Sequence, residues 1–502
     1  MTVPGVRGTL IARNALLNLT ALVIPLVIAL VALPIMIHGL GTERFGVLAI
    51  VWMVLTYVAE LGFGPTTQRY AAEALGGGRS HELGAIIWTT ARLQVAVGAA
   101  EGLALAAITP WLVTSVLNIP PAMTSEARNC FFVLAAAIPL LGLAKSFRGL
   151  VEAAQRFDLA LAVHLPLTAG SYVVAAVGAA RGWSLLAVFG VILIARLISV
   201  PANFMMARRA LPDISFKPTA HGAGLRELVT FAGWVSLSGL LSPLLVYIDR
   251  FIVGALLTMS AVTFYAAPYE LVARLVLIPG SILGALYPAF SQLAGQRDRE
   301  QAEQLAARSV NLMVVLLGPV IILARAGARD GLPLWLGPEY AVQSAAALQI
   351  LAVGVLVNAA AHVPFGLLQS IARPDVPARF HLIELPIHII VAWVLISRFG
   401  ITGAAAAWTG RTMLDAGLLF AAASRMKVLR APALSEANLP TTLAILTAAG
   451  AAAILAAAFI VSPGARITLA AAVVGVTAAL LWFVAVPVGE RLRITTFLRP
   501  GA

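Results

Sequence analysis

The chain alternates long apolar runs with short polar segments along its whole length. A bilayer core about 30 Å thick is crossed by a helix of about 20 mostly apolar residues, and glycine and proline mark the gaps between such runs. The pattern predicts about fourteen transmembrane helices, at 14–38, 45–66, 84–110, 129–151, 158–180, 184–206, 229–256, 264–290, 306–327, 344–370, 380–397, 403–424, 440–461 and 467–489. We therefore expect an all-α polytopic membrane protein.

The composition excludes the main alternative classes. Of the 502 residues, 60% are hydrophobic and 11% are charged, whereas a soluble domain carries about 25% charged residues. Disordered chains are excluded as well, because they are poor in hydrophobic residues. The single cysteine, Cys130, rules out an internal disulfide framework and a cysteine-rich zinc site.

The distribution of lysine and arginine predicts the orientation, because cytoplasmic loops carry an excess of both. With the N-terminus in the cytoplasm, 22 of the 34 basic residues fall in cytoplasmic segments or at the cytoplasmic ends of spans, seven in outer loops or at outer span ends, and five in the interior of spans. This bias predicts that both termini are cytoplasmic. The net charge of +12 is then mainly a topology signal, with attraction to anionic lipid as a second effect, and nucleic acid is not an expected partner.

Two polar connectors divide the chain. The predicted plan is an N-lobe of six spans at 1–206, a cytoplasmic connector at 207–228, a C-lobe of six spans at 229–425, and a last part at 426–502. That last part holds a connector, two further spans and a short cytoplasmic tail. Two six-span halves are a common transporter plan, with the substrate site between the repeats.

Three segments resemble bacterial polysaccharide flippases. Segment 33–73 resembles the first helical hairpin of those proteins, 247–298 resembles spans seven and eight, and 334–351 resembles the start of span ten. The residues that carry the resemblance are Gly41, Phe45, Gly46, Glu60, Leu61, Gly62, Phe63, Gly64, Arg69 and Tyr70, then Asp249, Arg250, Gly254, Tyr265, Tyr287 and Pro288, then Gly337, Glu339 and Tyr340.

The chain thus resembles the Wzx-type oligosaccharide flippases of the MOP exporter superfamily, which also contains the MATE drug exporters and the MurJ lipid II flippases. The resemblance implies two six-helix lobes around a central cavity, with two additional C-terminal helices. It also implies that the protein is not an enzyme but moves a polyprenyl-diphosphate-linked oligosaccharide from the inner to the outer leaflet of a bacterial inner membrane. A polysaccharide polymerase and glycosyltransferases are the partners expected in the same O-antigen or exopolysaccharide pathway.

Eleven charged side chains lie in the interior of the predicted spans: Arg92, Arg196, Arg250, Arg274, Arg411, Glu60, Glu101, Asp249, Glu270, Glu384 and Asp415. An ionisable group in hydrocarbon costs at least about 2.5–3.5 kcal/mol, so each needs a partner, a cavity or a role. The function of the protein should therefore be sought among these side chains.

The five arginines are candidate ligands of the lipid diphosphate, because a guanidinium can bind phosphate oxygens with two parallel hydrogen bonds. Arg196 lies near mid-span with no acid four residues away, whereas Arg92 could extend to the cytoplasmic surface. Glu270 and Arg274 share a helical face, as do Arg411 and Asp415, so those arginines could instead form structural salt bridges.

Six residues are candidates for coupling to an ion, H⁺ or Na⁺: Asp249, Glu270, Asp415, Glu384, His388 and Glu60. His381, Glu384 and His388 share one helical face, and histidine titrates near neutral pH. The alternative is a polar contact between helices. A metal site is not expected, because the spacing is not H-E-x-x-H and a third strong ligand is missing. Glu60 could either hold a lobe closed on the inner side or be solvated near the interface.

No catalytic or nucleotide-binding motif is present, so no cofactor is expected. Two transport functions remain as alternatives, a MATE-like antiporter of drugs or cations and a lipid II flippase. A membrane-embedded polymerase or glycosyltransferase is disfavoured, because the longest outer loops reach only about 20 residues.

Overall fold

The computed structural model describes residues 8–60, 64–212 and 244–280, five positions between 282 and 293, and then 298–371, 373, 375–460 and 462–486. Every regular element in these residues is helical. Nine of the described helices are long and apolar enough to cross a membrane, and two shorter apolar helices lie at Ile24–Leu40 and Leu439–Leu455. The protein is therefore a multi-pass membrane protein whose described part is all-helical, as the apolar runs predict.

The described residues form two compact units, Met1–Thr263 (unit 1) and Phe264–Ala502 (unit 2). The helices of unit 1 are α1 (Gly8–Leu40), α2 (Thr42–Glu60), α3 (Gly64–Gly76), α4 (Leu83–Trp111), α5 (Pro121–Ala153), α6 (Phe157–Ala180), α7 (Leu185–Ala210) and a stretch at 244–256. Most of the predicted connector 207–228 lies outside the described residues, so the predicted lobe boundary stays a prediction.

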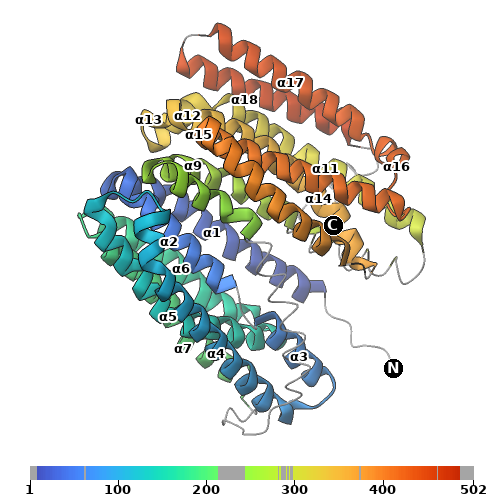
Figure 1. Cartoon of the computed structure of the whole chain (residues 1–502). Helices are drawn as coiled ribbons and strands as arrows, with labels where there is room; N and C mark the ends of the chain where they lie inside the picture. Colours follow the sequence, from blue (N-terminus) through green and yellow to red (C-terminus); the bar gives the residue numbers. More distant parts are fainter. Residues whose placement is uncertain are drawn as a thin grey trace. The chain divides into compact units, whose positions relative to one another are not determined.

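Unit 1 is assembled around α5, which packs against α2, α3, α4 and α7, while α6 lies beside α1 and α7 (Figure 1). Small residues allow the close approach of α4 and α5. A side chain at Gly98 or Gly102 of α4 would collide with the backbone of Pro139 or Ala135 of α5. Close contact through small residues is how helices associate in a membrane without a hydrophobic driving force.

Helix α3 is an element that the apolar pattern does not predict. The predicted second span ran to residue 66, whereas α2 ends at Glu60 and a short helix begins at Gly64. Its apolar residues Ala71 and Ala74 pack against Leu83 and Phe147. A helix of 13 residues that includes two threonines, a glutamine, an arginine and a glutamate falls below the length that a span requires, so the search for spans overlooked it.

Unit 2 begins inside α9 (Met259–Ala273), which continues as a tighter turn at Arg274–Val276. Its other helices are α11 (Arg299–Ala326), α12 (Ala328–Leu336), α13 (Glu339–Gln343), α14 (Ala345–Ser370), α15 (Asp375–Arg425), α16 (Ala431–Glu436), α17 (Leu439–Phe459) and α18 (Pro463–Leu480). Helix α14 packs against both α11 and α15.

Helix α15 consists of two helices joined by a sharp reversal at Gly400, whose φ of 59° and ψ of −140° are not helical. Glycine reaches positive φ without the steric penalty that a Cβ atom brings. The two halves then cross so closely that a side chain at Gly403 would collide with the backbone of Leu395. The reversal separates the predicted spans 380–397 and 403–424 and brings residues of both halves together.

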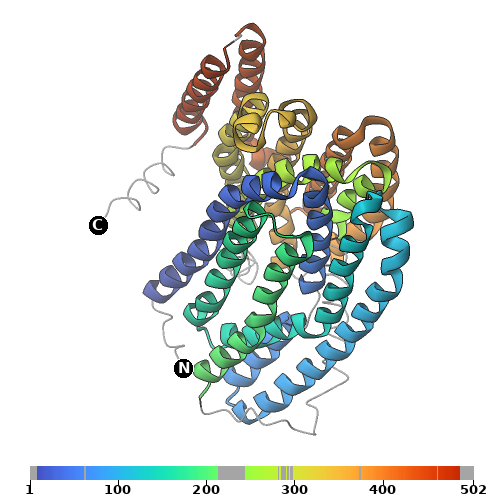
Figure 2. The same ribbon diagram turned by 90° about the vertical axis from the view of Figure 1, so that its left-hand side faces the viewer.

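The last two helices form a pair, α17 and α18, which packs against α11 (Figures 1 and 2). Asn311 of α11 accepts a hydrogen bond from Thr442 of α17, 2.6 Å, and donates one to the carbonyl oxygen of Ala485, 3.2 Å. These bonds lie among apolar residues that include Val314 and Leu446.

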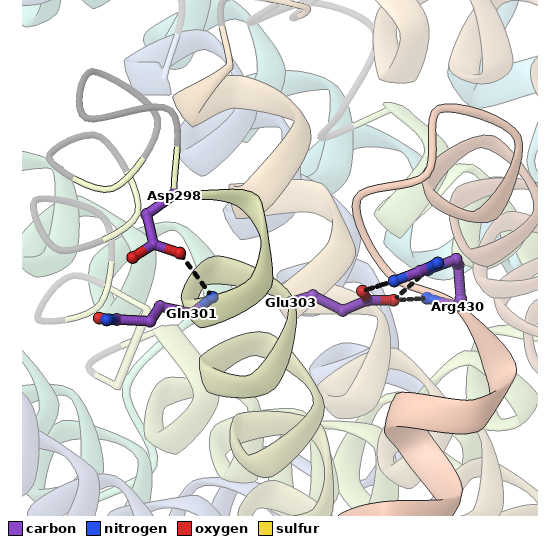
Figure 3. Close-up of polar contacts among 4 residues, drawn as sticks. All are labelled: Asp298, Gln301, Glu303 and Arg430. Carbon is purple, nitrogen blue, oxygen red and sulfur yellow. Dashed lines mark hydrogen bonds and ion pairs between the residues drawn. The ribbon is translucent and has the colours of Figure 1, made fainter.

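A second polar contact fixes the chain that leads into this pair (Figure 3). Arg430, which precedes α16, donates to Glu303 of α11 from its backbone nitrogen (2.7 Å), from Nε (2.9 Å) and from Nη2 (2.6 Å). The hydrogen bonds and the charge of Glu303 raise the pKa of Arg430 above its usual value. At the start of α11, Asp298 accepts from the backbone of Gln301, 3.0 Å, which caps the helix.

Candidate functional site

The two halves of α15 bring Glu384 and Arg411 together. Nη1 of Arg411 donates to Oε2 of Glu384 over 3.5 Å. The exposed fraction of Arg411 is 9%, and that of Glu384 is 1%. The sequence pattern paired Arg411 with Asp415 four residues on, whereas the reversal at Gly400 supplies Arg411 with a partner from the preceding span. The pairing follows from the tertiary fold rather than from spacing along one helix.

Asp415 and two histidines of α15 complete this cluster in unit 2, and a third histidine, on α14, lies near it. Oδ1 of Asp415 lies 3.9 Å from Nε2 of His381, and its carboxyl group is close enough to interact with that of Glu384. His362 of α14 lies within electrostatic range of Asp415, and His388, 2% exposed, lies within range of Arg411. We call Glu384, Arg411, Asp415, His381 and His388 the α15 cluster.

Several buried polar atoms of the α15 cluster have no hydrogen-bond partner: Oε1 of Glu384, Oδ1 of Asp415, Nε of Arg411, and both ring nitrogens of His388. Each such atom costs about 1–3 kcal/mol, more when charged. Buried polar groups are paired in the great majority of cases, and exceptions call for an explanation. Five exceptions around two carboxylates make this the strongest candidate site in the described part of unit 2.

The charges of the α15 cluster do not cancel. Two carboxylates and one guanidinium leave one negative charge when the histidines are neutral. Such a group can take up one proton or one monovalent cation. Among the residues that the structure describes, no group of three or more histidine, cysteine or acidic side chains is arranged to hold a metal ion.

In unit 1, three basic side chains come together from three helices. Arg148 of α5 and Arg196 of α7 both lie close enough to His164 of α6 to act on its ring electrostatically. Arg148 also pairs with Glu152 at 2.7 Å. Arg196 was predicted as a site residue, whereas Arg148 and His164 were not. No local spacing links the three, because each lies on a different helix.

The remaining candidates from spans seven and eight divide between the two units. Asp249 and Arg250 are buried in unit 1, where the guanidinium of Arg250 lies 5.0 Å from the ring centre of Tyr247. Glu270 and Arg274 belong to unit 2 and form the predicted ion pair, 3.0 Å long.

The candidates Arg92 and Glu60, and the acid Glu101, lie outside the groups described above. Arg92 is exposed on α4, nine residues after the helix begins at Leu83. Glu60 is the last residue of α2, and its side chain lies outside the described part of the chain. Glu101, an intramembrane acid, has one buried carboxylate oxygen without a hydrogen-bond partner.

Comparison with known families and sequences identifies relatives. A family model described as "Polysaccharide biosynthesis protein" matches residues 35–345. A putative O-antigen transporter of Shigella flexneri is 28% identical over 412 residues, which cover 82% of this chain and 96% of the relative. A probable low-salt glycan biosynthesis flippase, Agl15, of Haloferax volcanii is 25% identical over 192 residues, 38% of this chain and 40% of the relative.

Solved structures establish the fold. A structure of the lipid II flippase MurJ in an inward closed conformation has a TM-score of 0.71 at 10% identity, and the match covers 97% of this chain and 100% of that one. An inward-facing multidrug resistance transporter of the MATE family, in the MOP superfamily, has a TM-score of 0.69 at 14% identity, over 84% of this chain and 99% of that one. The protein therefore has the MurJ- and MATE-like fold that its resemblance implied.

The matched residues 35–345 make up more than half of the chain and include nearly all of the three segments that resemble flippases, apart from residues 33–34 and 346–351. The sequence-based resemblance to the Wzx-type flippases is confirmed. The chain belongs to the polysaccharide biosynthesis protein family.

Proposed function

We propose that the protein is a secondary transporter for surface polysaccharide synthesis, which flips a polyprenyl-diphosphate-linked oligosaccharide from the inner to the outer leaflet. The membrane is a bacterial inner membrane, and the substrate is moved without a covalent change. One observation carries the proposal: the similarity to the Shigella O-antigen transporter extends over nearly all of that relative. A flippase fold over the whole chain supports it independently.

The proposed topology has fourteen spans and cytoplasmic termini. Support comes from the three-to-one excess of Lys and Arg in the predicted cytoplasmic segments over the outer loops. A short outer turn at Gly400, as in the proposed topology, agrees with the tight reversal within α15. Transport then proceeds by alternating access of the two lobes to the two sides of the membrane.

We assign the diphosphate first to Arg196, together with Arg148 and His164. These three basic groups come from different helices and converge within one unit, which suits a ligand with several phosphate oxygens. Arg250, Arg274, Arg411 and Arg92 are further candidates for later steps. Arg411 and Arg274 have carboxylate partners, as Arg148 has in Glu152.

We assign the coupling ion to the α15 cluster, with Glu384 and Asp415 as its carriers. Support comes from the net negative charge and from the oxygen of each carboxylate that lacks a donor. A proton fits this environment better than Na⁺, because the neighbours of the two carboxylates are nitrogen groups of Arg411 and His381 rather than further oxygens. Asp249, Glu270, Glu60 and His388 are secondary candidates.

The function is tested by deleting the gene and measuring three phenotypes. The proposal predicts a loss of surface polysaccharide, accumulation of lipid-linked oligosaccharide in the inner leaflet, and recovery when the gene is restored. Normal viability argues against a lipid II flippase, and unchanged sensitivity to cationic drugs argues against a MATE-like antiporter. Normal surface polysaccharide in the deletion strain would exclude the proposed function.

A further inference from the structure

The sequence-based domain plan and the contacts in the structure assign residues 244–263 to different parts of the molecule. The predicted domain plan assigns them to the C-lobe, which starts at 229, whereas their contacts place them in unit 1. The division between the units falls between Thr263 and Phe264, inside the helix α9. From Phe264 onward the partners belong to unit 2, since Ser344 donates to the carbonyl oxygen of Phe264 over 2.7 Å.

Asn118 makes the first set of contacts that hold this segment. Its backbone nitrogen donates to the carbonyl oxygen of Gly254, 2.9 Å. Its side-chain nitrogen donates to the carbonyl oxygens of Ala255, 2.9 Å, and Leu257, 2.8 Å. Asn118 lies in the turn between α4 and α5, and it binds carbonyl groups at the C-terminal end of the helix at 244–256, which have no partner within that helix.

Thr42, the first residue of α2, makes the second set. Its carbonyl oxygen accepts a hydrogen bond from the hydroxyl of Thr263, 2.6 Å, and its own hydroxyl lies 3.1 Å from that of Ser260. One turn further along α2, Gly46 lies directly against the carbonyl oxygen of Met259, where a side chain would not fit. The first turn of α9 therefore rests on the first turn of α2.

These contacts have the properties of a reversible attachment. They join an amide, hydroxyl groups and helix-end carbonyls, and none of these groups is charged. The Asn118 contacts are exposed, so water can replace each bond when the surfaces separate and no polar group is left unsatisfied. The Glu303–Arg430 contact is different, because separating it would leave a buried carboxylate without donors.

We infer that Asn118 and Thr42 form a latch for residues 244–263 on the predicted outer face, and that the latch opens once in every transport cycle. When it opens, residues 244–263 leave α2 and move with the chain that follows Phe264. This inference rests on the proposed function, because only a transporter needs to open its outer side. It adds the residues that control the opening.

A disulfide tests the latch. In the variant T42C/S260C the two cysteines replace hydroxyl groups 3.1 Å apart, close enough for a disulfide after a small shift. Cys130 is fully buried and can stay. We expect oxidation to reduce flipping of a lipid-linked oligosaccharide in proteoliposomes at least tenfold, and a reducing agent to restore it. Full cross-linking with unchanged flipping would overturn the latch.

The matched control is N311C/T442C, which joins α11 to α17 at side chains 2.6 Å apart. These helices lie within unit 2, so we expect oxidation to leave flipping within twofold of the reduced rate. The single variants T42C and S260C control for the substitutions. If the wild-type protein and all reduced variants fail to flip the substrate, the proposed function is at fault rather than the latch.

A second measurement tests the latch without a transport assay. In S260C, a membrane-impermeant maleimide added from outside reports how often Ser260 leaves Thr42. Replacing Asn118 by alanine removes two side-chain hydrogen bonds, and we expect labelling about tenfold faster in N118A/S260C. Equal labelling rates in the two variants would show that Asn118 does not hold the segment.

Discussion

Two pairs of the same residue types, Glu303–Arg430 and Glu384–Arg411, differ in almost every physical respect. In the first, both carboxylate oxygens accept hydrogen bonds, the shortest 2.6 Å long, and the arginine side chain is 57% exposed. In the second, the contact is 3.5 Å long, the arginine side chain is 8% exposed, and the other carboxylate oxygen has no donor. The first pair is complete as a structural joint. The second pair leaves one carboxylate oxygen of Glu384 able to accept a proton or a cation.

Removing each arginine should give the largest contrast. Arg411→Ala leaves two carboxylates buried beside each other, and breaking a buried pair costs about 3–5 kcal/mol. For Arg430→Ala we expect a smaller loss, about 1–3 kcal/mol, because the arginine side chain is 57% exposed, so water can reach the place that it leaves. Thermal unfolding in detergent micelles measures both. Equal losses would mean that burial does not distinguish the pairs.

When the glutamates are neutralised instead, we expect the Glu303 variant to lose more stability and the Glu384 variant to lose more transport. Glu384→Gln removes a buried charge, so we expect stability to be unchanged or higher while gradient-driven flipping falls at least tenfold, about 1.4 kcal/mol. Glu303→Gln should lower stability by about 1–2 kcal/mol with flipping changed less than twofold. Vesicles with an imposed pH gradient provide the measurement. A normal rate for Glu384→Gln would exclude the α15 cluster as the coupling site.

Unit 1 extends the comparison, because its candidate site around His164 is built from arginine side chains instead. Arg196→Ala should weaken binding of a polyprenyl diphosphate about tenfold, and Arg196→Lys should recover only part of this because lysine cannot bind two oxygens in parallel. Binding of a fluorescent polyprenyl diphosphate to the purified protein gives the values. Alanine at the exposed Arg209 of α7 is the control and should leave affinity unchanged.

The smallest effect is expected at Gly400, which sets the geometry of the second pair. Gly400→Ala forces a Cβ atom into a positive-φ conformation and should cost about 1 kcal/mol. The Glu384–Arg411 contact depends on this reversal, so we also expect a two- to threefold fall in flipping. Gly410→Ala, where a side chain meets open space, should change neither quantity. If Gly400→Ala changed neither stability nor flipping, the α15 cluster would not depend on the reversal at Gly400.

The sequence predicted the helices better than their partners. Apolar length alone locates the described long helices, since each must match the bilayer, and charge alone selects Glu384, Arg411 and Asp415. The sequence could not predict that Glu384 pairs with Arg411, because this contact depends on the backbone at Gly400 and on the rotation of two helices. The convergence of Arg148, His164 and Arg196 was hidden for the same reason.

The short helix α3 and the Glu303–Arg430 contact were missed for another reason. Both lie at the ends of spans, where polar residues are frequent and each is individually unremarkable. The residues of the latch are likewise ordinary in sequence: Asn118 and Thr42 are polar residues in turns. Only their contacts across more than a hundred residues distinguish them from neighbouring turn residues.

The reversal at Gly400 also bears on how the chain enters the membrane during synthesis. A segment that carries a lone buried arginine or glutamate is inserted at a cost of about 2.5–3.5 kcal/mol. The halves of α15 leave almost no loop between them, so they can pass into the lipid as a single hairpin, with Glu384 already facing Arg411. A longer linker at this point would separate the two insertions in time, and each charge would then meet the lipid alone.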